Sequence, residues 1–191
     1  VSWARRCVYE TGKHTITLLS MREPMVIHSI TLSNAADKPS YAQVKSGNDA
    51  AGAKNTSGKL ITIEGENPTR TSSQMLYPIQ DQSSPSVSPS SPKMLLNNTI
   101  GGNSWRLVGQ WIEWDFDVEE SGYYNISLYD SQNFVRGIYV SRKITIDGEI
   151  PFKELEAYGF KYDQSWREDV LQDAGGTPYL SLIHISEPTR H

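Results

Sequence analysis

The sequence holds almost no cysteine: Cys7 is the only one in 191 residues. A single thiol cannot form an internal disulfide, so no disulfide framework is expected. Basic residues are also in the minority, with 18 Lys and Arg against 22 Asp and Glu. This balance argues against nucleic acid as a partner, because nucleic-acid-binding domains usually carry a basic stripe. No apolar run is long enough to span a bilayer, so direct membrane insertion is not expected.

Helical periodicity is scarce as well. No helical period persists for more than one or two turns, although 152–158 is compatible with a short helix. What the sequence does contain is Ser, Asn, Thr, Tyr and Trp together with frequent turn residues. This composition is typical of an all-β protein.

The clearest predicted strand runs from Trp111 to Val118. Its even-numbered residues are apolar and its odd-numbered residues are mostly acidic, so one face is expected to be buried. Further strands are predicted at 13–18, 25–32, 60–64, 124–128 and 140–146, the last ending at a turn at Asp147 and Gly148. The proline-rich 83–92 is predicted to be an exposed loop. These patterns predict an antiparallel β-sandwich or jelly roll.

Both ends of the chain resemble translated sequencing adapter. The terminal string SLIHISEPTR matches one strand of a transposase adapter, and the initial VSWARRCV matches the opposite strand. Such segments are excluded from fold reasoning. We therefore expect 1–11 and 181–191 to be non-native, with Val1 to Val8 and Ile183 to His191 packing poorly. The remainder divides into the end of a preceding β-sandwich module (12–34), a mobile linker (35–58) and a main module (59–180).

Several short motifs resemble carbohydrate-binding modules of the galactose-binding-like jelly-roll fold. They are Asn98 to Trp105, Gly109 to Trp114, Gly122 to Tyr124 and Ile146 to Gly148. The closing strand of such a module would follow Leu180, where the adapter-like residues begin. The resemblance therefore implies a jelly roll that is truncated at its last strand.

A closer likeness is carried by Gln132 to Gly137, Pro151 to Leu155 and Gln164 to Trp166. These segments are similar to the β-sandwich region that precedes the solute-binding domain in extracellular binding proteins of bacterial sugar ABC importers. The resemblance implies an extracellular or cell-surface location in a bacterium and carbohydrate as the partner. It also implies a downstream solute-binding domain that is missing from this fragment.

Sugar recognition needs an aromatic face for the pyranose ring and polar groups for its hydroxyls. The candidate ligand-binding residues are the aromatic Trp105, Trp111, Tyr162 and Trp166 and the polar Asn103, Gln132, Asn133 and Arg136. The plainer interpretation is that these aromatics pack the edges of the sandwich. Strand parity assigns Trp114 to the core instead.

Glu64 and Glu66 are expected to share one face of a strand. Two carboxylates so placed could bind a hard cation, and in the resembling modules this position holds a structural calcium ion. The alternative interpretation is a solvated acidic edge. The sequence therefore leaves two interpretations open, a calcium site and a solvated acidic edge.

No catalytic constellation is visible. Carboxylates neighbouring on one strand face do not oppose each other across a cleft, as glycoside hydrolysis requires. No nucleophile elbow, histidine cluster or phosphate loop is present. We therefore expect no enzymatic activity and predict a non-catalytic glycan-binding module of a solute-binding protein for carbohydrate uptake. The alternatives are a structural spacer or interaction module without a ligand, and an accessory module of a polysaccharide-degrading enzyme.

A truncated sandwich exposes unpaired backbone groups at the edge next to the missing strand. The segment Lys13 to Leu18 has the alternation that such a strand needs. We predict that it pairs with the main module, beside Leu60 to Glu64.

Overall fold

The structure, a computed structural model, describes residues 15–17, 26–30, 37–56, 58–134 and 136–184. The chain divides into two compact units, Val1–Ala36 and Asp37–His191. The described residues of the first unit, 15–17 and 26–30, form neither helix nor strand. All elements named below belong to the second unit.

The regular β-structure of the second unit consists of short antiparallel strand pairs. They are β1 (Arg70–Thr71) with β4 (Ile112–Glu113), β2 (Pro78–Ile79) with β3 (Thr99–Ile100), β5 (Gly122–Asn125) with β10 (Leu180–Ile183), β6 (Ser127–Asp130) with β9 (Arg167–Val170), and β7 (Val140–Arg142) with β8 (Tyr158–Phe160). The helices are α1 (Tyr41–Ala50) and two 3-10 segments, η1 (Gly102–Ser104) and η2 (Lys153–Ala157). The predicted β-rich class is confirmed at this level.

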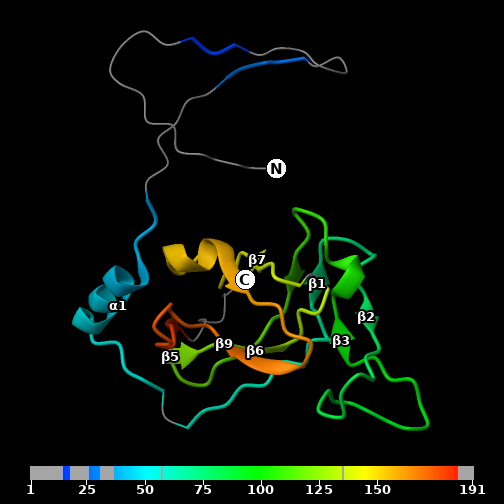
Figure 1. The fold of residues 1–191 in the computed structure, drawn as a ribbon. Helices are drawn as coiled ribbons and strands as arrows, with labels where there is room; N and C mark the ends of the chain where they lie inside the picture. Colours follow the sequence, from blue (N-terminus) through cyan, green and yellow to red (C-terminus); the bar gives the residue numbers. More distant parts are fainter. Residues whose placement is uncertain (1–14, 18–25, 31–36, 57, 135, 185–191) are drawn as a thin grey trace, which may run out of the picture. The chain divides into compact units, whose positions relative to one another are not determined.

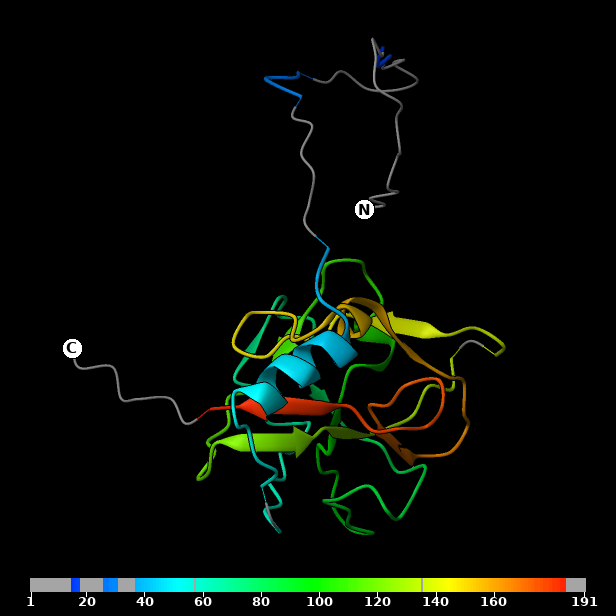
Figure 2. The ribbon, with the colours of Figure 1, turned by 90° about the vertical axis from the view of Figure 1, so that its left-hand side faces the viewer.

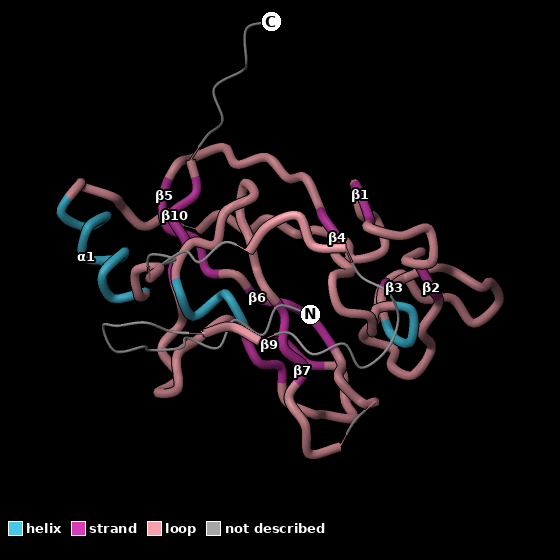
Figure 3. The backbone as a smooth tube through the Cα atoms, turned by 90° about the horizontal axis from the view of Figure 1, so that it is seen from above, coloured by secondary structure: helices cyan, strands magenta, loops and turns pink. Residues whose placement is uncertain are grey.

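The strand pairs follow one another across the second unit. Figures 1 and 3 show the β1–β4 and β2–β3 pairs at one end, α1 with β5 at the other, and the β6–β9 pair between them. The β6–β9 pair therefore lies between the α1 end and the end formed by the β1–β4 and β2–β3 pairs.

The main hydrophobic core lies at the α1 end. Its buried residues come from η2 and the residue before it, from β8, and from segments next to β9 and β10: Phe152, Leu155, Phe160, Leu171 and Tyr179. Tyr41 of α1 joins them, with its ring centroid 5.0 Å from that of Phe152 and 4.8 Å from that of Tyr179. Edge-on ring contacts of this kind add to the stabilisation from burial.

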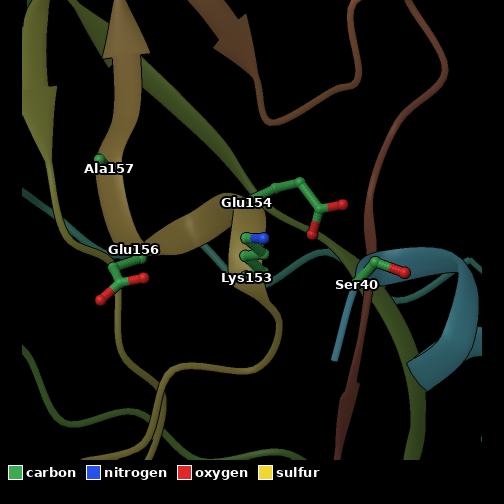
Figure 4. A pocket seen from close by; sticks show the side chains of 5 residues that line it. All are labelled: Ser40, Lys153, Glu154, Glu156 and Ala157. Carbon is green, nitrogen blue, oxygen red and sulfur yellow. The ribbon is translucent and has the colours of Figure 1, made fainter. Parts of the chain in front are cut away.

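The helix α1 contradicts the predicted linker over 35–58. The backbone N–H of Ser40 donates to the Gln43 side chain (2.9 Å), as in the capping motif that starts many helices. The next N–H, of Tyr41, donates to the Glu154 carboxylate of η2 (2.9 Å), and Figure 4 shows Ser40 and Glu154 lining one depression. The segment is poor in strong helix formers, so docking of the helix on the core stabilises it more than propensity does.

The far end of α1 is held by β5. Tyr123, which is buried, donates its hydroxyl to the Asp49 carboxylate (2.9 Å). The backbone of Tyr123 also exchanges hydrogen bonds with Lys54 and Thr56, so β5 is bonded on this side as well as by β10. Figure 2 shows α1 lying across β10.

The strand β10 corrects the expectation that the adapter-like end is inert. Ile183 is 7% exposed and pairs with Gly122, and Ser181 is equally enclosed. An open strand edge pairs with an extended segment through its backbone groups, and β10 does so with Ser181 and Ile183 on its buried side. The module is therefore not left without a strand beside β5. Residues 1–11 and 185–191 lie outside the described residues.

Three predicted strands are wrong in the described residues. Thr15–Thr17 and Val26–Ile30 belong to no strand, and neither does the segment 60–64, where Leu60 is almost fully exposed. Among the described residues, 60–64 therefore pairs with no strand, contrary to the prediction for this segment; Lys13, His14 and Leu18 lie outside the described residues. Alternation alone does not make a strand, because a partner must satisfy its backbone groups.

The predicted strand 111–118 is shorter than expected. Only Ile112–Glu113 is paired, while the predicted parity holds in part: Trp111 and Asp115 are exposed and Trp114 is half-buried. Trp114 is not a core residue, since it lies outside the buried cluster and its indole N–H donates to the Gly65 carbonyl. Phe116, predicted to face inward, is exposed.

The second half of the chain agrees better with its pattern. The strand predicted over 124–128 is divided at Ile126 between β5 and β6, and within β5 the buried ring is Tyr123 instead of Tyr124. Asp147 and Gly148 both have positive φ in a tight turn, as predicted. The short helix predicted within 152–158 is η2. No strand forms within 83–92, although Val87 is buried there.

Candidate functional site

Two aromatic rings lie side by side at the β6–β9 pair. Tyr129 is on β6, and Trp166 immediately precedes β9; their ring centroids are 5.8 Å apart with an interplanar angle of 26°. Side chains alternate along a strand, so Tyr129 points away from the side that Leu128 packs into the core, and it is 47% exposed. We call Tyr129 and Trp166 the aromatic platform.

The polar tips of both rings are held by the serine- and proline-rich loop 83–92. The indole N–H of Trp166 donates to the Ser83 hydroxyl (3.0 Å), and the Tyr129 hydroxyl donates to that of Ser86 (2.6 Å). The same loop is anchored by the buried Val87. The platform is thus bordered by hydroxyl groups, and its rings are held in place.

A polar pocket adjoins the platform along the chain. It is lined by Arg136, Tyr162, Asp163, Gln164 and Ser165. The Gln164 amide donates to the Tyr162 hydroxyl (3.0 Å), and the Ser165 N–H donates to the Asp163 carboxylate (2.9 Å). Because Ser165 directly precedes Trp166, the pocket ends where the platform begins. We call these five residues the polar pocket.

Gln132 connects the polar pocket to a neighbouring loop through hydrogen bonds. Its side chain is 7% exposed and donates to the Ile138 carbonyl (2.9 Å), while its backbone carbonyl accepts from the Asp163 N–H (3.0 Å). It thereby ties two loops together. Of the predicted polar ligands, Arg136 lines the pocket directly, Gln132 supports it, and Asn133 is exposed nearby in sequence.

A cluster of charged side chains lies at the base of the site. Arg167 on β9 contacts Asp169 (3.0 Å) and Asp163 (3.5 Å). Opposite Arg167 in the strand pair is Asp130, whose Oδ1 atom is buried without a hydrogen-bond partner among the described residues. Burial, reinforced by the charge of Asp169, raises the pKa of Asp130 to about 6, although Arg167 opposes this shift.

Trp105 is placed differently from Trp166. The Arg142 guanidinium lies over its ring, 4.2 Å from the centroid, and donates to the Trp105 carbonyl (3.1 Å). The indole N–H donates to the Gln110 carbonyl (3.3 Å). One face of Trp105 is therefore occupied by Arg142, and burial lowers the pKa of that arginine.

The other predicted ligand residues do not join this site. Trp111 is 47% exposed beside β4, where its backbone N–H donates to the Ser72 hydroxyl. Asn103 is exposed within η1. Among the described residues, no ring contact joins Trp105 or Trp111 to the platform. The structure therefore groups Trp166, Tyr162, Arg136 and Gln132 and leaves the remaining candidates apart.

The proposed calcium position lacks the expected geometry. Glu64 is followed by a turn at Gly65 and Glu66, so the two glutamates do not share a strand face. Glu66 has one buried carboxylate oxygen without a hydrogen-bond partner. Within the part of the chain that the structure describes, no group of three or more His, Cys, Asp or Glu side chains is arranged to hold a metal ion.

Tyr129 is the one residue of the platform that the sequence analysis did not single out. Its signal was present: in the predicted strand 124–128 the apolar Ile126 and Leu128 lie on one face, so parity places Tyr129 on the other. The alternation of apolar residues along the strand is therefore enough to predict that Tyr129 is exposed.

Comparison of the chain with models of protein families, with curated proteins and with solved structures found no match. Among the described helices, none has the length and apolar character needed to cross a bilayer.

Proposed function

We propose that the unit Asp37–His191 is a non-catalytic glycan-binding module whose site is the aromatic platform with the adjoining polar pocket. The observation that carries this proposal is the stacked, partly exposed pair of Tyr129 and Trp166. Aromatic rings held in this way can stack on the C–H face of a pyranose. The jelly-roll likeness and the setting in a bacterial extracellular solute-binding protein for sugar uptake belong to the same proposal.

The polar pocket supplies groups that suit sugar hydroxyls. Arg136 offers guanidinium donors, while Asp163 and the hydroxyl of Tyr162 offer acceptors. A few fixed polar groups beside an apolar surface are what orients a small ligand. Stacking would thus provide affinity, and the pocket would provide orientation.

A glycan array tests the proposal. The intact chain should be retained by at least one class of glycan, and Trp166→Ala and Tyr129→Ala should each lose that retention while keeping the far-ultraviolet circular dichroism of the parent. Trp111→Ala is the matched control, since Trp111 is as exposed as Tyr129 but lies beside β4. Loss of retention with Trp111→Ala and not with Trp166→Ala would place the site elsewhere and contradict the proposal.

The competing function is a structural spacer without a ligand. Two of the predicted ligand residues favour this function because they make contacts within the protein. One face of the Trp105 ring is occupied by Arg142, and the Gln132 side-chain amide donates to the Ile138 carbonyl. A folded chain that binds no glycan on a broad array would favour the spacer.

A further inference from the structure

We propose that Asp130 makes the polar pocket pH-sensitive by competing with Asp163 for Arg167. This inference rests on the proposed function, because it concerns how the same pocket is regulated. Its physical basis is a cluster in which Arg167 contacts Asp163 and Asp169 while a third aspartate, Asp130, lies close by without such a contact. The arginine is on β9, directly across the strand pair from Asp130.

The present contacts of Arg167 leave Asp130 out. One guanidinium nitrogen donates to Asp169 at 3.0 Å and also approaches the Lys161 carbonyl at 3.4 Å, while the other lies 3.5 Å from Asp163. The contact with Asp163 is the longer of the two carboxylate contacts. It is therefore the one that Arg167 gives up most easily when another carboxylate competes.

The environment of Asp130 suits a neutral carboxyl group. Its Oδ1 and the neighbouring Ser131 hydroxyl oxygen are both buried without hydrogen-bond partners among the described residues. A buried, unpaired carboxylate is strongly disfavoured. The groups that face it are Asp169 and Asp163, which repel a negative charge, and Arg167, which attracts one.

Ionisation of Asp130 changes which pairing is most stable. When its proton leaves to solvent, a second negative charge appears beside Asp169, and the positive charge that attracts it is Arg167. A shift of the guanidinium toward Asp130 releases Asp163, the only member of the cluster that lines the polar pocket. A carboxylate freed from its ion pair is a stronger acceptor for a sugar hydroxyl.

The pocket is therefore expected to bind its glycan more tightly as pH rises through the range in which Asp130 ionises, near pH 6. The gain should be about ten-fold, the size of one hydrogen bond to a charged group. In Asp130→Asn, which stays neutral, affinity should not change across the same range. Asp117→Asn is the matched control, because Asp117 is an exposed aspartate outside the cluster.

The experiment makes two measurements on the same protein. Side-chain NMR follows the aspartate carboxyl carbons and the Arg167 guanidinium from about pH 4.5 to about pH 8, and binding to the best glycan of the array is measured over the same range. The inference predicts that the Asp163 and Arg167 signals move with the midpoint of Asp130 and that Asp130→Asn abolishes this movement. It also predicts that binding follows that midpoint.

The outcomes separate the two proposals. If Asp163 and Arg167 do not follow Asp130, the inference is overturned, whatever the protein binds. If the Asp163 and Arg167 signals follow Asp130 but glycan binding does not change with pH, the regulation is overturned and the proposed function stands. If the signals are coupled but no glycan binds at any pH, the proposed function and the regulation that rests on it both fall.

Discussion

The α1 end of the second unit and the aromatic platform use the same residue types for opposite purposes. At the α1 end, Tyr41, Phe152 and Tyr179 contact one another inside a buried cluster. At the platform, Tyr129 and Trp166 also stack, but Tyr129 is 47% exposed and the polar tips of both rings meet serine hydroxyls. The difference teaches that an aromatic pair indicates a site only when its surroundings leave a ring accessible and fix its orientation.

The largest expected effect comes from the core side of this comparison. Leu155→Ala removes a side chain that is 0% exposed and should lower the free energy of unfolding by about 2–5 kcal/mol. Denaturant unfolding measures this loss. If Leu155→Ala were as stable as the parent while Trp166→Ala unfolded the chain, the roles assigned to the two regions would be reversed.

The next effect concerns the close approach of β5 to the segment that follows α1. A Cβ at Gly122 would lie 2.7 Å from the Lys54 carbonyl oxygen, whereas a Cβ at Gly47 would meet nothing within 4 Å. Gly122→Ala should therefore destabilise the unit by about 1–3 kcal/mol. Gly47→Ala, in the exposed part of α1, should stabilise it by about 0.5–1 kcal/mol. Opposite signs in thermal unfolding are the expected result; equal signs would show that β5 does not pack on 54–56.

A smaller effect is expected at the base of the platform. Because the pKa of Asp130 is raised to about 6 from an ordinary 3.8, the folded state favours its neutral form. This contribution is fully present below about pH 4 and is lost as pH rises through about 6. Asp130→Asn should then be more stable than the parent at about pH 7.5 by roughly 1 kcal/mol, after allowance for partial exposure.

The advantage of Asp130→Asn should shrink to a small remainder at about pH 4, because the parent carboxyl is then protonated in the folded state and about half protonated in the unfolded state, whose pKa is the ordinary 3.8. Asp117→Asn should show no such pH-dependent gain. A constant stability difference at all pH values would mean that Asp130 does not titrate between these limits. Urea unfolding at matched pH values provides the measurement.

The sequence predicted the β-rich class because its turns and alternation are local signals. The Asp147–Gly148 turn needs positive φ, which that pair accepts, and η2 begins where its pattern indicated. The helix α1 was missed because its stability comes from contacts with Glu154 and Tyr123, which are distant in sequence. The segment 60–64 was overestimated for the converse reason: its alternation is real, but no strand lies beside it among the described residues.

In the candidate site, too, features that depend on residue type were predictable, and features that depend on distant contacts were not. Trp166, Tyr162 and Arg136 could be named as candidates from their residue types, but their grouping at one place depends on the fold. The occupation of Trp105 by Arg142 was not predictable, since the two are far apart in sequence and meet only through the fold. Burial of Ser181 and Ile183 was likewise unpredicted, because pairing with β5 depends on an open edge and not on the origin of the segment.

The most direct test of the central claim is glycan retention by Trp166→Ala and by Trp105→Ala, measured side by side on one array with thermal unfolding as the folding control. The account predicts that Trp166→Ala stays folded and loses retention. It also predicts that folded Trp105→Ala keeps its retention, because one face of the Trp105 ring is occupied by Arg142 and the residue lies apart from the platform. Retention that survives in Trp166→Ala and disappears in a folded Trp105→Ala would contradict the account.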